Sequence, residues 1–323
     1  MKAKAVEKLV LGLISTITVL VVALLITILA VLFVKGYPAL HIGFLFEESR
    51  DFGRAGGVLY QSAGTLILMI TAVLLSLPVA LGSVLYQTEY LSSGKLKTFL
   101  MQLTYILNAT PTILFGLVGY LFFGVYLDAG VSWVTGSLIL AVMILPTLQV
   151  SIREAVEGLP EKYREAGMVL GLTRSAQIYR IILPQCFYGI VTGIFLGLAR
   201  VAGETAAIMF TATTFSGIQL PQSYSDPVPT LQTHILILAQ EAVNPESLAQ
   251  AWGAGLVLIG LVFIIPFLYF LIKKNLNSFF YKRFLIIFSL GILQALVGWW
   301  MVKSGLSEDP YVSPYRLTFQ DRK

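Results

Sequence analysis

An apolar run without a charged residue extends over residues 9–34. At 1.5 Å per residue, a helix of this length is about 39 Å long, which exceeds the roughly 30 Å of hydrocarbon in a bilayer. Three lysines precede the run, as in a signal peptide. However, the run is longer than the apolar region of a signal peptide, and no small-residue cleavage pattern follows it. The run therefore predicts a first membrane-spanning helix.

Further apolar runs predict an all-α polytopic membrane protein with about six transmembrane helices. We expect the next spans at residues 64–86, 98–124, 136–150, 187–211 and 251–272, and an extra C-terminal span at residues 284–302. Charged residues make up only 12 % of the chain, whereas a soluble domain has about a quarter. Composition thus excludes an ordinary soluble enzyme or binding module.

The basic residues predict the orientation of the chain. If the N-terminus is cytoplasmic, the inner segments hold 14 of the 22 Lys and Arg residues, the outer segments hold 7, and Arg200 lies inside a span. Such an excess on the inner side is typical of membrane proteins. The net charge of +5 is therefore an orientation signal, and we expect no nucleic-acid partner.

The chain divides into three predicted parts: residues 1–55 with the first span and an outer loop, a core at 56–275, and an extra span with a tail at 276–323. Within the core, the sequence Asn-Ala-Thr-Pro-Thr at residues 108–112 predicts a kink or unwinding of the third span. Residues 213–250 lack Lys and Arg, which predicts an outer loop with a short interfacial helix at 231–242. We expect His41 and His234 to lie in outer segments and Cys186 to be a small apolar residue of a helix.

A polar interval with helical spacing lies at residues 153–184, between two apolar runs. Its spacing predicts two short amphipathic helices, with an apolar stripe that includes Val169 and Leu170. Gly171 separates them, since glycine adopts the backbone angles of a tight turn at little cost. Pro184 lies where the next helix begins, a position at which a missing amide donor is tolerated.

The interval resembles the EAA loop of ABC importer permeases, with a glycine in place of the second alanine as the one departure. The positions that correspond to the motif are Glu165, Ala166, Gly167 (the departure), Gly171, Ile181, Leu183 and Pro184. The resemblance implies that the loop at 153–184 is cytoplasmic and docks into a groove on a separate ATPase subunit. The alternative is an ordinary amphipathic connector between two membrane helices.

The fifth predicted span carries two charged residues, Arg200 and Glu204. Glycines at 189, 193 and 197 lie four residues apart and permit close approach of a neighbouring helix. Arg200 and Glu204 are also four apart, so in a continuous helix they share a face and can pair. Each costs about 2.5–3.5 kcal/mol alone at the membrane centre, so both must face protein or a water-filled path.

Two interpretations of this pair stay open. It is either a structural ion pair that fixes helix packing, or it lies on the translocation path, where Arg200 attracts an anion and Glu204 holds Arg200 when the path is empty. The guanidinium offers paired donors that suit a tetrahedral oxyanion. The Glu204 carboxylate could then accept a hydrogen bond from the protonated oxygen of monohydrogen phosphate. Sulfate has no such donor at neutral pH.

The sequence around the pair, Ala-Arg-Val-Ala-Gly-Glu-Thr-Ala at 199–206, resembles the A-type permease of the phosphate-specific ABC importer. The likeness extends over residues 56–275. It implies a MetI-like core and a substrate path that involves Arg200, Glu204 and Thr205. Departures are Ala207, where the family often has proline, and the extra C-terminal span.

By this resemblance, the chain imports phosphate across a bacterial inner membrane together with a C-type sister permease, two ATP-binding subunits and an extracytoplasmic phosphate-binding protein. We expect no cofactor in the chain itself, because no Gly-x4-Gly-Lys-Ser/Thr loop is present and ATP and Mg²⁺ belong to the partner ATPase. One alternative is the same architecture with sulfate or molybdate as cargo. Another, from a different class, is an intramembrane enzyme that works without an ATPase.

Overall fold

The computed structural model describes residues 2–91, 94–213, 219–240 and 245–272. Five helices of this part are long and apolar enough to cross a membrane, or six if one bent pair is counted as a span. The count agrees with the six spans predicted for this region. The extra span at 284–302 and the tail lie outside the described residues.

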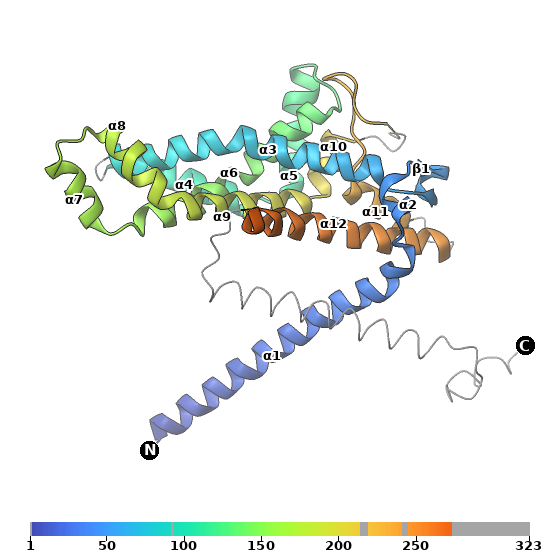
Figure 1. Cartoon of the computed structure of the whole chain (residues 1–323), viewed down its shortest axis with the longest axis horizontal. Coiled ribbons are helices and arrows are strands. Elements are labelled where there is room, and N and C mark those ends of the chain that lie inside the picture. Colours follow the sequence, from blue (N-terminus) through green and yellow to red (C-terminus); the bar gives the residue numbers. More distant parts are fainter. Residues whose placement is uncertain (1, 92–93, 214–218, 241–244, 273–323) are drawn as a thin grey trace, which may run out of the picture.

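The chain begins with helix α1 (Lys2–Gly36), whose first residues lie toward the end of the bundle that carries α7 and α8 (Figure 1). A short 3-10 helix η1 (Tyr37–Ala39) and helix α2 (Ile42–Phe46) follow at the opposite end. Strands β1 (Ser49–Arg50) and β2 (Ala55–Gly56) form an antiparallel hairpin around the 3-10 turn η2 (Asp51–Gly53), with Ser49 opposite Gly56.

The bundle consists of α3 (Leu59–Leu85), α6 (Trp133–Glu157), α9 (Leu183–Ala202) and α12 (Pro245–Ile272), which run lengthwise beside one another (Figure 1). The buried core joins α3, α6 and α9, and includes Leu68, Ile144 and Leu148. Many other apolar side chains are exposed, as on α1, because a spanning helix presents them to lipid or to partner helices.

The predicted glycine face of α9 packs against α6. A Cβ added to Gly189 would lie 2.2 Å from the Cβ of Ala155, and one added to Gly193 would lie 3.1 Å from the Cβ of Ser151. The glycines thus let the two backbones approach more closely than any larger residue would allow.

The predicted break at residues 108–112 is a sharp bend. Helix α4 (Lys95–Ala109) and helix α5 (Thr112–Gly119) meet at 98°, with Pro111 between them. Proline disfavours helical backbone at the preceding residue, which ends α4. Segments with π-helical hydrogen bonds extend α3 and α5 and precede α9: η3 (Tyr86–Tyr90), η4 (Tyr120–Tyr126) and η5 (Ile178–Ile182).

Two sequence predictions require correction. The fifth span does not continue to residue 211: α9 ends at Ala202, and a separate helix α10 (Ala206–Thr211) follows. Helix α11 (Leu231–Gln240) is not a surface element, because four consecutive residues from Leu231 to His234 are buried among α3, α12 and the outer loop. His234 therefore lies in the interior, where Gly53 packs on its ring.

Candidate functional site

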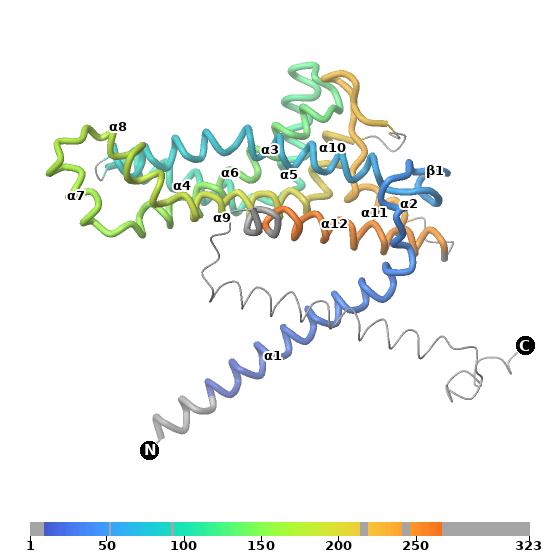
Figure 2. Tube along the Cα trace, viewed as in Figure 1, coloured from blue at the N-terminus to red at the C-terminus, as the bar shows by residue number. Residues whose placement is uncertain are grey.

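The polar interval forms helix α7 (Glu161–Val169), helix α8 (Arg174–Gln177) and η5 at one end of the bundle (Figure 2). The predicted turn at Gly171 is confirmed, since this residue has a φ of +69°. The Leu172 amide donates to the Gly167 carbonyl (3.0 Å) and the Gly171 amide to the Met168 carbonyl (2.9 Å). This pair of hydrogen bonds is a Schellman motif, which ends a helix with a left-handed residue.

The structure brings distant positions of the EAA-like segment together. Gly167 is buried against η5, where an added Cβ would lie 2.9 Å from Cδ1 of Ile181. Glu165 and Ala166 are exposed on α7, whereas Leu183 and Pro184 form the first turn of α9, as predicted. The segment of α7, α8 and η5 is therefore compact, and its motif residues Gly167 and Ile181 pack on each other. We call this segment, residues 161–182, the elbow.

Of the predicted apolar stripe, Ala166, Val169 and Leu170 are exposed, and so is the neighbouring Met168. The exposed fractions are 60 % for Met168, 87 % for Val169 and 75 % for Leu170. Three adjacent exposed apolar side chains on a polar helix form a patch that is suited to a protein contact.

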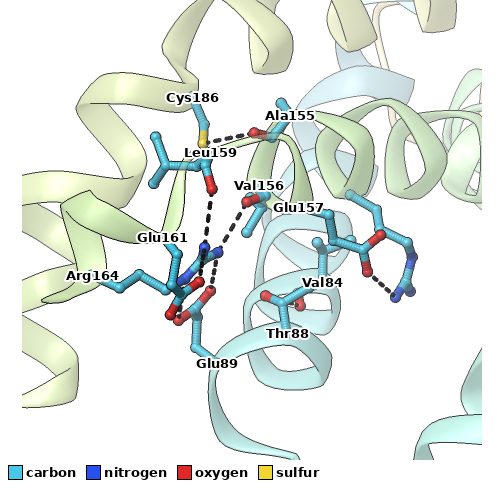
Figure 3. A network of polar contacts seen from close by, with 11 residues as sticks. Val84, Thr88, Glu89, Ala155, Val156, Glu157, Leu159, Glu161, Arg164 and Cys186 are labelled. Atoms are coloured by element: carbon cyan, nitrogen blue, oxygen red, sulfur yellow. Dashed lines mark hydrogen bonds and ion pairs between the residues drawn. The ribbon is translucent and has the colours of Figure 1, made fainter.

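Arg164 fastens the elbow to the bundle (Figure 3). Its Nη2 lies 3.0 Å from Oε1 of Glu89 in η3, and its Nε lies 3.5 Å from Oε2. The same guanidinium donates to the carbonyl of Val156 (3.0 Å) in the last turn of α6 and to that of Leu159 (3.3 Å) in the turn that follows. A cation is favourable there because the last carbonyls of a helix lack partners.

The hydrogen bond to Glu89 raises the pKa of Arg164 above its ordinary value, although partial burial acts in the opposite direction. Arg164 thus stays charged at any physiological pH. A second arginine, Arg153, also ties α6 to η3 by donating to Oε1 of Gln87 at 2.7 Å.

Arg200 lies in the last turn of α9 and is partly buried. Its Nη1 donates to Oδ1 of Asn108 (3.0 Å) at the α4–α5 bend and to Oγ1 of Thr147 (2.9 Å) on α6. Both acceptors are neutral, so they orient the guanidinium without cancelling its charge. The sequence marked the bend around Asn108, but nothing in it singled out Thr147.

The predicted pairing of Arg200 with Glu204 is not found between these described residues. The reason is that α9 ends at Ala202, so Glu204 no longer lies one turn along the same helix. Glu204 is instead buried, and its Oε1 accepts a hydrogen bond from the Ala207 amide (3.1 Å) at the start of α10. Thr205 precedes α10 directly.

Gln232 caps the end of α9 at the break between α9 and α10. The sequence analysis did not identify this residue. Its buried Nε2 donates to the carbonyls of Ala202 (3.0 Å) and Val201 (3.4 Å), the end of α9. Its Oε1 accepts from Thr65 of α3 (3.1 Å). The α9–α10 break is therefore capped on both sides: by Gln232 at the carbonyl end and by Glu204 at the amide end.

Comparison with known proteins identifies the family. The family model "Binding-protein-dependent transport system inner membrane component" matches residues 78–278. The chain is also 33 % identical to the probable phosphate transport system permease protein PstA of Methanocaldococcus jannaschii, over 78 % of this chain and 88 % of that protein. The chain belongs to the permeases of binding-protein-dependent ABC transporters. Within that family it is PstA-like, as a 31 % match to PstA 2 of Mycobacterium tuberculosis also indicates, over 72 % of this chain and 76 % of that protein.

Other matches bear on the fold and on the C-terminal part. A probable ABC transporter permease protein, YqgI of Bacillus subtilis, is 26 % identical over 88 % of this chain and 99 % of its own length. The solved MetNI methionine ABC transporter in inward-facing conformations gives a TM-score of 0.54 at 17 % identity, and the match covers 69 % of this chain and 95 % of that chain. The permease therefore has a MetI-like fold. The model of a second family, "Cytochrome oxidase assembly protein", matches residues 254–319, which extend beyond α12.

Proposed function

We propose that this permease is the membrane-spanning subunit of an ATP-driven importer that carries inorganic phosphate into the cytoplasm. The observation that carries the proposal is the Arg200 guanidinium, held at the end of α9 by Asn108 and Thr147. A fixed cation with neutral partners can bind an oxyanion without first breaking an ion pair, so the free-energy cost of binding is lower. The names of the PstA relatives support phosphate as that anion.

Coupling to a separate ATPase is the second part of the proposal. The exposed patch of Met168, Val169 and Leu170 at the tip of the elbow supports a docking role for the EAA-like segment. In this arrangement the elbow and the N-terminus are cytoplasmic, two ATPase subunits bind ATP and Mg²⁺, and a C-type sister permease completes the path. An extracytoplasmic phosphate-binding protein delivers the substrate at the opposite face.

The position of Glu204 refines its proposed role. Its carboxylate caps α10 four residues beyond Arg200, so it shapes the break through which phosphate would pass. If it also accepts the proton of monohydrogen phosphate, a Glu204→Gln variant should keep the cap, since an amide oxygen can still accept, but lose phosphate uptake. Normal uptake by that variant would remove Glu204 from the substrate path.

The main test is uptake of radiolabelled phosphate in a strain that lacks the chain. Wild type should restore uptake, Arg200→Gln should not, and Arg50→Gln should serve as a control because Arg50 is exposed in the hairpin at the opposite end from the elbow. Unchanged phosphate uptake in the deletion strain, with loss of sulfate or molybdate uptake, would assign a different oxyanion. Since the relatives are transport permeases, an intramembrane enzyme is not favoured.

A further inference from the structure

One guanidinium at the junction of the elbow and the bundle joins three separate elements. Arg164 of α7 contacts Glu89 in η3 (Figure 3). It also donates to the carbonyl of Val156 in the last turn of α6 and to that of Leu159 in the turn that follows. A further contact to Glu161 (3.4 Å) remains within α7. The side chains of Arg164 and Glu89 are only 18 % and 11 % exposed, so water screens their pairing less than it screens a surface pair.

The contact depends on the planar, forked shape of the Arg164 guanidinium, which we call the arginine fork. Five hydrogen bonds leave this planar group in fixed directions: two toward the Glu89 carboxylate, two toward backbone carbonyls and one toward Glu161. A lysine ammonium carries the same charge but is a compact point with freely rotating donors, so it cannot hold both sets at once. The contact therefore fixes the orientation of α7 relative to η3 and α6 as well as its distance.

The two helices that Arg164 links to the elbow, α6 and α3 with its extension η3, also extend toward Arg200, the proposed substrate position. Helix α6 carries Thr147, which holds Arg200, and α3 continues into η3, which carries Glu89. The covalent connection from α6 to α7 runs through Gly158, Leu159 and Pro160, a short turn without a helix of its own. Besides this turn, side chains join α7 to the bundle: Arg164 by directional hydrogen bonds, and Tyr163 by apolar packing on the core.

We propose that Arg164 is a positioning residue that makes the elbow and the ends of α3 and α6 move as one body, so that displacement of α7 by the ATPase reaches the helices around Arg200. This inference rests on the proposed function. It predicts that loss of the fork separates ATP hydrolysis from transport, because the ATPase can still bind the exposed tip while the motion is no longer passed on.

The experiment measures phosphate transported per ATP hydrolysed, with the complete transporter in proteoliposomes that contain phosphate-binding protein. Arg164→Lys should keep ATP hydrolysis within about twofold of wild type, while the transport ratio falls at least fivefold. Glu89→Gln should also lower the ratio, because it weakens the same pairing and leaves the carbonyl contacts intact. Arg50→Lys is the matched control, since it alters an arginine of an exposed ion pair with Glu47.

Cys186 provides a readout of folding around the pair. It is the only cysteine of the chain, is 2 % exposed, and its Sγ donates to the Ala155 carbonyl at the end of α6 (3.3 Å). A reduced ratio with Cys186 still protected from maleimide supports the inference. A reduced ratio with Cys186 reactive would overturn it, since the role would then be structural.

The remaining outcomes are also decisive. An unchanged ratio in both Arg164→Lys and Glu89→Gln would overturn this inference and leave the phosphate importer standing. If Arg164→Lys fails to assemble, the ratio measured for Glu89→Gln decides. Absence of phosphate uptake by the wild-type transporter would overturn the proposed function, and the inference with it.

Discussion

Nη1 of Arg200 and Oδ1 of Asn108 lie 3.0 Å apart, although 92 positions separate the two residues in the chain. The contact joins the end of α9 to the sharp bend between α4 and α5. Helix ends and bends of this kind expose backbone groups at membrane depth, and they are tolerated where they are buried in protein or line a cavity. The substrate path that we propose beside Arg200 would satisfy that condition.

The first prediction concerns this contact. Asn108→Asp would place a carboxylate against the guanidinium and turn a hydrogen bond with one charged partner into an ion pair, which adds up to about 1 kcal/mol. Phosphate would have to compete with that carboxylate, so we expect the maximal uptake rate to fall by about fivefold. The measurement is uptake at saturating phosphate-binding protein. Asn108→Ala, which removes the acceptor without adding charge, should have a smaller effect, and a larger effect of alanine would contradict the argument.

The sequence predicted the elbow with high accuracy because its signals are local. Gly171 in a left-handed turn, Pro184 in the first turn of α9 and the alternation of polar and apolar residues each act within a few positions. The spans followed from length and hydropathy for the same reason. The glycine face of α9 was also predictable, because residues four positions apart lie on the same face of a helix.

What sequence reasoning could not give was the partner of each polar group across the bundle. It treated 187–211 as one helix, and a continuous helix would have paired Arg200 with Glu204. The break between α9 and α10 is capped by Gln232, which comes from a different element and has no local signature. His234 was predicted in an outer segment because residues 213–250 lack Lys and Arg, and its burial against Gly53 came from a contact that the sequence does not show.

The second prediction concerns Gln232. Gln232→Leu would remove the side-chain donor to the Ala202 carbonyl at the end of α9. The Val201 carbonyl still accepts from the Glu204 amide (3.1 Å), so the loss of one buried hydrogen bond costs about 1–3 kcal/mol. We expect a lower thermal unfolding midpoint in detergent. Gln240→Leu is the control, since Gln240 lies on the same helix but is exposed. Equal midpoints for the two variants would show that Gln232 does not cap α9.

The third prediction concerns the contact of α9 with α6. Gly189→Ala places a methyl group 2.2 Å from the Cβ of Ala155, so the helices must separate, and overpacking of this kind costs about 1–3 kcal/mol. Gly82→Ala in α3 meets no atom within 4 Å, and alanine there should be neutral or stabilising by about 0.5–1 kcal/mol. Thermal unfolding of both purified variants tests the contrast. A stable Gly189→Ala protein would mean that the two helices approach less closely than described.

The fourth prediction is a pH dependence of stability from His234. Burial lowers the pKa of this histidine from its ordinary 6.5 to about 4, so the folded protein holds it neutral. Between these two values the unfolded chain binds a proton that the folded chain does not, so stability falls as the pH decreases from 6.5 toward 4. One pKa unit corresponds to about 1.4 kcal/mol, which gives a loss of about 2 kcal/mol at pH 5.

The measurement for His234 is the difference in unfolding free energy between pH 7 and pH 5, compared for wild type and His234→Gln. Acidic groups titrate in both proteins and cancel in this comparison, so wild type should lose about 2 kcal/mol more than the variant. The absolute stability of the variant does not matter, because only its pH slope enters. Parallel pH profiles would mean that the imidazole is hydrated in the folded protein and that the interior around Gly53 admits water.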